Sequence, residues 1–272
     1  MNTRYLGIDF SGGALPWREG TRRPTVWVAT ARMRADGLRL DSLVPVQDLP
    51  GSGDAFGRLV SLLAQGDYAA AGIDAPFSLP EDHMPAGGHR NLVNRVGALP
   101  NASDRPFPRG QALVDLAAAI RPLVSAKPLR AVERHWQGRG VNTRSTLWNG
   151  PRGGAPFAVA ALALIARSSR PCWPWSLTGP GRLAEVFPAA QLKTWGLPHQ
   201  GYSAEAGRGV RGEIVEHLAE RMTLPSGLRT LMAGSPDALD AVIALFGAAW
   251  ADRTDENLPA AAEQEGWIAV HP

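Results

Sequence analysis

The sequence contains little cysteine, carries little net charge and lacks a long hydrophobic run. Its single cysteine, Cys172, excludes an intrachain disulfide and a zinc site built from several cysteines, and it suits a reducing compartment. A formal net charge of +3 over 272 residues excludes a polycationic protein. The longest apolar run, residues 155–166, is too short to span a bilayer, and no basic stretch leads into an apolar core at the start of the sequence. We therefore expect a cytoplasmic protein that has no membrane partner.

Hydrophobic residues make up 44% of the chain, which is enough for a substantial core, and their spacing predicts the elements around it. Alternating or continuously apolar segments predict five strands, over residues 4–10, 25–33, 38–46, 68–74 and 182–187. Helical spacing predicts helices over residues 52–66, 212–222 and 235–253. The last residues, 266–272, would add an edge strand.

Residues 75–180 differ from the rest of the chain. They are rich in proline, glycine and arginine, and they contain two helical stretches, 110–125 and 155–168. We interpret this segment as a largely helical, arginine-rich insertion within a single domain that covers residues 1–272.

Two of the predicted strands end in the same three residues, Gly-Ile-Asp. The first motif places Asp9 in "YLGIDFSGG" and the second places Asp74 in "GIDAPFSLP". A carboxylate is costly at the end of a buried strand unless it is paired or serves a purpose. The element order, three strands followed by alternating helices and strands, resembles that of the ribonuclease H-like fold. The resemblance implies an α/β fold with a mixed five-stranded sheet, three antiparallel strands followed by parallel ones, in which Asp9 and Asp74 end neighbouring strands.

Four blocks of the sequence resemble, in order, the signature blocks of a family of predicted nucleases grouped as domain of unknown function 429. The blocks are "GIDFSGG", "GIDAPFSLP", "EVFPAAQLKTWG" and "SPDALDAVIALFGAAWA", and they span nearly the whole chain. The third block departs from the family pattern Glu-x-His-Pro-Glu, because Phe187 and Ala189 stand in place of the histidine and the second glutamate. The resemblance implies the ribonuclease H-like fold and a nuclease activity.

Acidic residues on separate elements are the candidate site residues. The candidate catalytic residues are Asp9, Asp74, Glu185 and Asp240, and the candidate metal ligands are Asp9, Asp74, Asp237 and Asp240. Asp237 and Asp240 lie three residues apart on one helical face, where alanines would let the helix pack close to the sheet. Each acid also has a structural interpretation, as a helix cap, as the partner of an arginine or, for Asp237, as a charge that stabilises the helix dipole.

Such a group of carboxylates, without cysteine and without paired histidines, favours Mg²⁺ or Mn²⁺ over zinc. Two divalent ions can activate a water molecule and stabilise the leaving oxygen during hydrolysis of a phosphodiester. The sequence therefore predicts a metal-dependent nuclease with a two-metal carboxylate site.

A basic segment supports this prediction. Residues 121–152 carry seven lysines and arginines and one acid, Glu133. Arginine binds phosphate groups, and aromatic rings stack on unpaired bases. The candidate nucleic-acid-binding residues are Arg130, Arg134, Arg139, Arg144 and Trp136. The partner would be DNA or RNA. The alternative interpretation is a solvated basic surface whose tryptophans anchor the segment to the core.

Two other functions stay open. The stretch "DFSGG" resembles the phosphate-binding hairpin of actin-like ATPases and small-molecule kinases, although no second Asp-Gly hairpin follows it. The protein would otherwise be a non-catalytic nucleic-acid-binding protein, although such a protein gains nothing from carboxylates beside phosphates. The sequence leaves the oligomeric state open.

Overall fold

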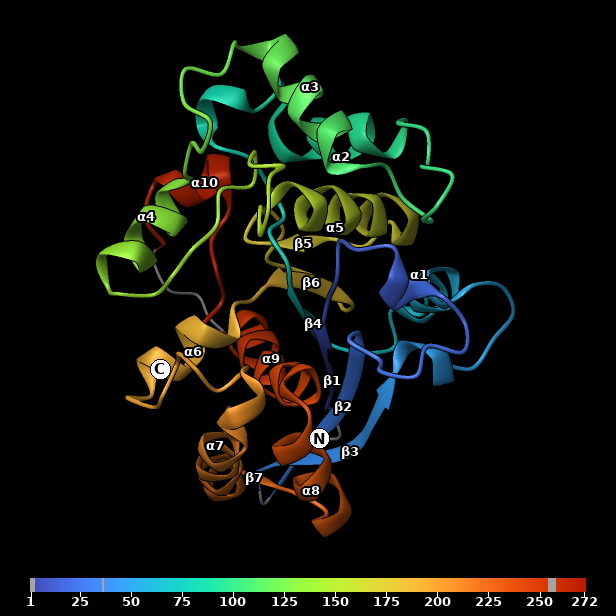
Figure 1. The fold of residues 1–272 in the computed structure, drawn as a ribbon, viewed down its shortest axis with the longest axis vertical. Helices are drawn as coiled ribbons and strands as arrows, with labels where there is room; N and C mark the ends of the chain where they lie inside the picture. Colours follow the sequence, from blue (N-terminus) through green and yellow to red (C-terminus); the bar gives the residue numbers. More distant parts are fainter. Residues whose placement is uncertain (1–2, 36, 254–257) are drawn as a thin grey trace.

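The computed structural model describes residues 3–35, 37–253 and 258–272. Within these residues, seven strands form one mixed sheet in the order β5-β6-β4-β1-β2-β3-β7 (Figure 1). The strands are β1 (Thr3–Asp9), β2 (Trp27–Arg34), β3 (Gly37–Pro45), β4 (Ala70–Asp74), β5 (Cys172–Trp173), β6 (Arg182–Glu185) and β7 (Met222–Thr223). The predicted α/β class with a mixed sheet is confirmed, but the predicted count of five strands is wrong, because β5 and β7 extend the two edges. Each of these strands has two residues, which is too short to show a period in the sequence.

The three N-terminal strands form the predicted antiparallel meander, and the next two predicted strands add to it in parallel. β2 pairs antiparallel with both β1 and β3, whereas β4 pairs parallel with both β1 and β6. β4 therefore lies inside the sheet, as its continuous apolar run predicts. The bounds of the five predicted strands shift by at most two residues.

Helices cover both faces of the sheet. The described helices are α1 (Ala55–Gln65), α2 (Gly88–Gly97), α3 (Gly110–Ile120), α4 (Ala131–Gly138), α5 (Ala155–Ser168), α6 (Pro188–Thr194), α7 (Arg208–Arg221), α8 (Ser226–Gly234), α9 (Pro236–Arg253) and α10 (Ala261–Glu265). α1 and α5 pack with Leu6 and Ile8 of β1, while α7 and α9 pack with Tyr5. Because side chains alternate along a strand, these two groups of helices lie on opposite faces of the sheet.

The segment 75–180 contains four helices, two more than the sequence predicts. The sequence does not predict α2 and α4, because they are short and have few buried apolar positions. The buried side chains of Leu92, Leu113 and Leu164 belong to the same core cluster as Ile8 and Ile73. This segment therefore supplies much of the core on one face of the sheet. α2 and α3 lie beyond α5, at the end of the molecule away from α7 and α8 (Figure 1).

In the C-terminal region, the sequence predicts the start of α9 correctly but not the structure of the last residues. α9 begins as expected, because the Ser235 hydroxyl accepts a hydrogen bond from the Ala238 N–H. The predicted edge strand over 266–272 is reduced to one isolated bridge, in which Ala269 pairs parallel with Val186.

Among the described residues, no single helix is long and apolar enough to cross a membrane. α8 and α9 meet such a test of length and composition only as a pair, and the chain bends by 117° between them.

Candidate carboxylate site

The two Gly-Ile-Asp motifs lie side by side and in register. On the parallel strands β1 and β4, Gly7 pairs with Gly72, Ile8 pairs with Ile73, and Asp9 pairs with Asp74. The two aspartates therefore end adjacent strands at the same edge of the sheet. This is the arrangement that the repeated motif predicts.

The glycines of the two motifs let α9 approach the sheet. They lie on the same face as the aspartates, since side chains alternate along a strand. A Cβ atom added at Gly7 would lie 2.1 Å from the Ala241 carbonyl oxygen, and one added at Gly72 would lie 2.3 Å from the Ala244 carbonyl oxygen. Neither distance is possible for a real side chain. The backbone of α9 therefore rests directly on the two strands.

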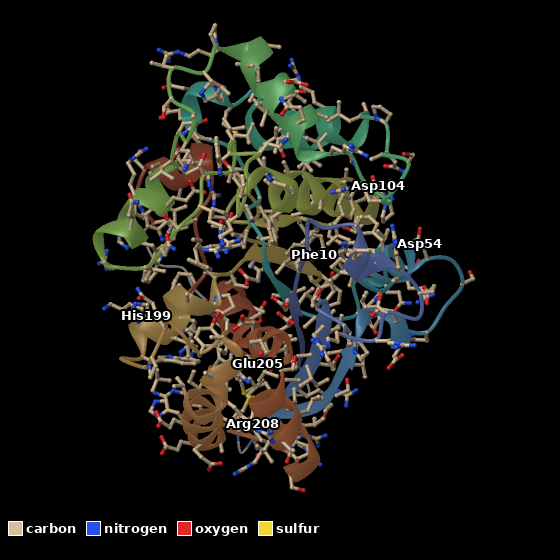
Figure 2. All side chains as sticks on the ribbon, in the orientation of Figure 1. Phe10, Asp54, Asp104, His199, Glu205 and Arg208 are labelled. Atoms are coloured by element: carbon tan, nitrogen blue, oxygen red, sulfur yellow. The ribbon has the colours of Figure 1, made fainter. Side chains whose placement is uncertain are left out.

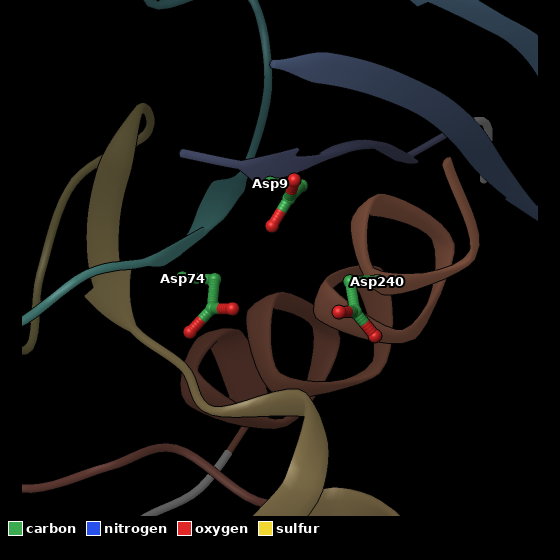
Figure 3. A group of neighbouring side chains, drawn as sticks. All are labelled: Asp9, Asp74 and Asp240. Carbon is green, nitrogen blue, oxygen red and sulfur yellow. The ribbon is translucent and has the colours of Figure 1, made fainter. Parts of the chain in front are cut away.

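This close packing brings Asp240, in the second turn of α9, to the ends of β1 and β4. One carboxylate oxygen of each of Asp9, Asp74 and Asp240 lies within 4.8 Å of the others (Figure 3). The three side chains come from three separate elements and point into a common space (Figure 3). Such a group can hold a divalent cation, because carboxylate oxygens are the ligands that Mg²⁺ and Mn²⁺ prefer.

Asp237 lies beside this group rather than in it. It stands in the first turn of α9 and is half-buried. Burial raises the pKa of Asp237 to about 6, while Arg211 acts in the opposite direction. Its charge contributes to the raised pKa values of Asp9 and Asp240.

The three central aspartates resist ionisation in the absence of a cation. Burial raises the pKa of Asp9 and of Asp240 well above the ordinary range, and repulsion from the neighbouring aspartates adds to the shift. Burial also raises the pKa of Asp74 to about 7, with Arg144 lowering it and Glu185 raising it. A bound cation would relieve this repulsion, so the donor set fits a divalent metal.

Tyr202 positions Asp240, and sequence reasoning missed it. Its hydroxyl donates a hydrogen bond of 2.9 Å to Asp240 Oδ1. Its own backbone is fixed, because the buried Arg211 donates to the carbonyl oxygens of Tyr202 and Ala204. No signal in the sequence singles out Tyr202, since it lies on the irregular connection between α6 and α7. His199 and Glu205 mark this connection in Figure 2.

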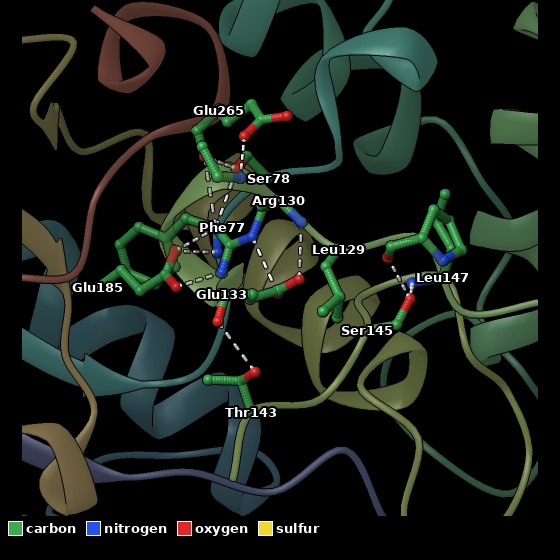
Figure 4. A network of polar contacts seen from close by, with 12 residues as sticks. Phe77, Ser78, Leu129, Arg130, Glu133, Thr143, Ser145, Leu147, Glu185 and Glu265 are labelled. Atoms are coloured by element: carbon green, nitrogen blue, oxygen red, sulfur yellow. Dashed lines mark hydrogen bonds and ion pairs between the residues drawn. The ribbon is translucent and has the colours of Figure 1, made fainter. Parts of the chain in front are cut away.

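Glu185 lies apart from the three aspartates and is bound to an arginine. Both of its carboxylate oxygens accept hydrogen bonds from Arg130, and Oε2 also accepts one of 2.9 Å from the Phe77 N–H (Figure 4). These contacts match the other interpretation of Glu185, that of a salt-bridge partner, while the expectation that it is a catalytic acid stays a prediction. It still lies close enough to raise the pKa of Asp74.

Arg130 is not on the surface, which corrects its prediction as a nucleic-acid-binding residue. Its side chain is 1% exposed, and it also forms an ion pair of 3.0 Å with Glu133. Its guanidinium donates a further hydrogen bond of 3.0 Å to the Ser78 hydroxyl (Figure 4). Arg130 thus joins α4, the end of β6 and the loop after β4. Burial raises the pKa of Glu133 to about 7, although Arg130 acts in the opposite direction.

The other predicted nucleic-acid-binding residues divide into two groups. Trp136 is 6% exposed and packs in a small core with Val132 and Val141, so it anchors α4 and offers no ring to a base. Arg134, Arg139 and Arg144 are exposed. Of these three arginines, Arg144 is the one that lines the cleft beside the aspartates.

A cleft of 720 Å³ opens beside the carboxylate group. Asp74 and Asp240 line it, together with parts of the connections that follow β4, α4, β6 and α6. Its volume lies within the range of about 300–1,000 Å³ that is usual for ligand sites. The group of three carboxylates, two of which line the cleft together with Arg144, can bind a metal ion and a phosphate together.

Comparisons with known proteins agree with the blocks in the sequence. No curated protein and no solved structure matches the chain. The model of the family described as "Protein of unknown function (DUF429)" matches residues 7–264, so the chain belongs to this family.

Proposed function

We propose that the protein is a divalent-metal-dependent nuclease that hydrolyses phosphodiester bonds. The observation that carries the proposal is the close group of Asp9, Asp74 and Asp240, with oxygens within 4.8 Å of one another beside a cleft. A bound divalent cation would offset the mutual repulsion of these three acids, which otherwise raises their pKa values.

The sheet supports a ribonuclease H-like arrangement as part of this proposal. Its five longer strands follow the order β3-β2-β1-β4-β6, antiparallel in the first part and parallel in the second. The carboxylates stand at the end of β1 and β4, where that fold carries its acidic residues according to the sequence resemblance. The single buried cysteine, Cys172, supports a cytoplasmic location.

The roles of the residues follow from their positions. Asp9, Asp74 and Asp240 would hold Mg²⁺ or Mn²⁺, which supply Lewis acidity and an activated water to phosphodiester hydrolysis. Tyr202 holds the Asp240 carboxylate in one orientation through its 2.9 Å hydrogen bond. Arg144 lines the cleft with Asp74, lies close enough to lower its pKa, and would bind the phosphate of the substrate. Arg130 and Glu185 hold the wall beside Asp74 in place.

The structure gives less support to the other two functions. In a phosphate-binding hairpin the glycine amides face the nucleotide, but Gly12 of "DFSGG" is buried and rests on the backbone of Pro156 and Phe157. A non-catalytic binding protein would place three carboxylates beside a phosphate with no benefit to affinity. The cleft and the acids together therefore favour the nuclease.

Hydrolysis of bis(p-nitrophenyl) phosphate and of single- and double-stranded oligonucleotides, with Mg²⁺, with Mn²⁺ and with a chelator, tests the proposal. We expect cleavage that requires the metal and that Asp74→Asn abolishes. Asp115→Asn is the matched control, since Asp115 is exposed on α3 and its variant should keep full activity. Activity that survives in Asp74→Asn, or turnover of a nucleoside triphosphate in its place, would contradict the proposal.

A further inference from the structure

We propose that the cleft takes an unpaired nucleic-acid strand rather than a double helix, an inference that rests on the proposed function and specifies its substrate. Three features of the cleft lead to it: the walls, the burial of the acids and the aromatic rings.

The two walls of the cleft are joined to each other. Asn142 and Arg144 line one wall, on the connection after α4, and Gln200 lines the other, on the connection after α6. Gln200 Nε2 donates a hydrogen bond of 3.0 Å to the carbonyl oxygen of Gly140, and the His199 ring nitrogen Nε2 lies 3.3 Å from the same oxygen. A widening of the cleft would have to break these contacts.

The acids are recessed, which suits a phosphate on a flexible strand. Asp9 is 7% exposed, and Asp74 and Asp240 are only partly exposed, inside the walls of the cleft. Proteins reach a double helix from outside, through its grooves and along its backbone, because paired bases keep the phosphates on a wide convex surface. A flexible single strand can bend a phosphate into a concave site of 720 Å³.

Aromatic rings line the cleft where an unpaired base would lie. Phe157, at the start of α5, and Phe187, just before α6, both line it and are both half-buried. The Arg144 guanidinium carbon lies 6.0 Å from the centroid of the Phe157 ring, so a cation and a ring share this wall. Unpaired bases stack on aromatic rings and on arginine, whereas paired bases within a duplex have both faces covered by their neighbours. These rings take the role that the sequence suggested for Trp136.

Binding of labelled oligonucleotides to Asp74→Asn, in the presence of Mg²⁺, tests this inference without the complication of cleavage. Single strands and matched duplexes of both DNA and RNA are compared at the same salt concentrations. We expect single strands to bind about tenfold or more tightly than duplexes. Phe157→Leu and Phe187→Leu remove a ring but keep apolar bulk, so they should fold, and each should weaken single-strand binding by about 5- to 100-fold.

Leu177→Ala is the control, because Leu177 is an exposed apolar side chain that does not line the cleft. Its affinity for single strands should equal that of the parent. Duplex binding equal to or tighter than single-strand binding, unchanged affinity in both phenylalanine variants, or no binding to any of the nucleic acids would overturn the inference. Selective single-strand binding without metal-dependent hydrolysis by the wild type would keep this inference and remove the nuclease. Preferential cleavage of duplexes would keep the nuclease and remove this inference.

Discussion

Gly7 and Gly72 are register partners on adjacent parallel strands, and the backbone of one helix, α9, rests on both of them. Two residues further along each strand, Asp9 and Asp74 are partners in the same way. The motif Gly-Ile-Asp therefore combines two requirements. Its glycine leaves room for α9, the helix that carries Asp240. Its aspartate lies close to Asp240 at the end of the strand.

A methyl group at either glycine should destabilise the fold. Gly7→Ala and Gly72→Ala would force the strands and α9 apart, because the obstacles are backbone oxygens at 2.1 and 2.3 Å. We expect each change to lower the free energy of unfolding by about 1–3 kcal/mol or more. Gly212→Ala in α7 is the control, since a Cβ atom there meets nothing within 4 Å and should stabilise the helix by about 0.5–1 kcal/mol. Urea unfolding measures the free energy of unfolding of all three variants. Equal changes in the two strand variants and in the control would contradict the close packing of α9 on the sheet.

Removal of one acid should relieve repulsion in the metal-free protein. Asp9→Asn is expected to unfold at the same temperature as the wild type or at a higher one in the presence of a chelator. Mg²⁺ should raise the melting temperature of the wild type, because it binds the native state alone, and should raise that of the variant less. Differential scanning fluorimetry gives both numbers. A variant that fails to fold would identify Asp9 as a structural residue instead.

The metal-free protein should lose stability as the pH rises from about 4 to about 7. Asp74 has a pKa of about 7 in the folded protein, above its ordinary value of 3.8, so the folded state holds the proton more tightly than the unfolded state. This stabilisation is complete below about pH 4 and is lost through pH 7, with a slope of at most about 1.4 kcal/mol per pH unit for one proton.

The comparison of the wild type with Asp74→Asn removes the contribution of Asp74 together with its effect on the pKa values of Asp9 and Asp240. Burial lowers the pKa of His89 to about 4. His89 therefore contributes stability that increases as the pH rises, opposite to the contribution of Asp74. Both proteins contain His89, so the difference between their urea midpoints cancels its contribution. The stability of the wild type relative to the variant should fall between about pH 4 and pH 7 in the presence of a chelator. A constant difference would show that Asp74 titrates normally.

Arg130 should be essential for stability, because it is the cation that pairs with two buried glutamates. Arg130→Met leaves Glu133 and Glu185 buried without their cation, which should cost about 3–5 kcal/mol. Arg134→Met, in the helix that Arg130 precedes, is the matched control, because Arg134 is exposed and its loss should change stability by less than about 0.5 kcal/mol. Urea unfolding followed by circular dichroism compares them. Similar midpoints for the two variants would contradict the buried network.

The exposed arginines should control the salt dependence of nucleic-acid binding. Arg144→Gln removes the contact to phosphate that the proposed function assigns to Arg144, and Arg139→Gln removes an exposed cation of the basic segment that the sequence predicts to bind nucleic acid. Each should reduce the slope of log affinity against log salt by about 1. Arg34→Gln is the control, since Arg34 lies at the opposite end of the sheet from Asp9. Fluorescence anisotropy at several salt concentrations measures the slopes. An unchanged slope in Arg144→Gln would remove this residue from the strand-binding surface.

Local patterns in the sequence were enough for the five longer strands and for the three acids of the group, Asp9, Asp74 and Asp240. β1 and β4 are recognisable because each is a short apolar run that ends in the same motif, and α9 is recognisable from its cap and its period. The alanines of α9 also indicate a close approach to the sheet, and the structure confirms that approach at Gly7 and Gly72. Each of these features depends on residues that lie close together in the sequence, so it can be recognised without knowledge of the fold.

The basic segment shows why composition alone was misleading. Arg130 and Arg134 are four residues apart in one basic stretch, yet the first is buried with Glu133 and Glu185 while the second is in solvent. Glu185 was predicted to be a catalytic residue because it ends a strand, but its carboxylate is bound to Arg130. Charge counts do not reveal which charges will be paired with residues that are distant in the sequence.

The sequence by itself determined the α/β class, the antiparallel and parallel parts of the sheet, and the acids that end β1 and β4. The tertiary structure alone decided that Tyr202 holds Asp240, that Arg130 is internal, and that Phe157 and Phe187 line the cleft. The physical reason is the range of the interactions. Strand and helix patterns arise from hydrophobic burial along one segment, whereas the partner of a buried charge and the lining of a cleft depend on which loops the packing of α9 and α5 brings together.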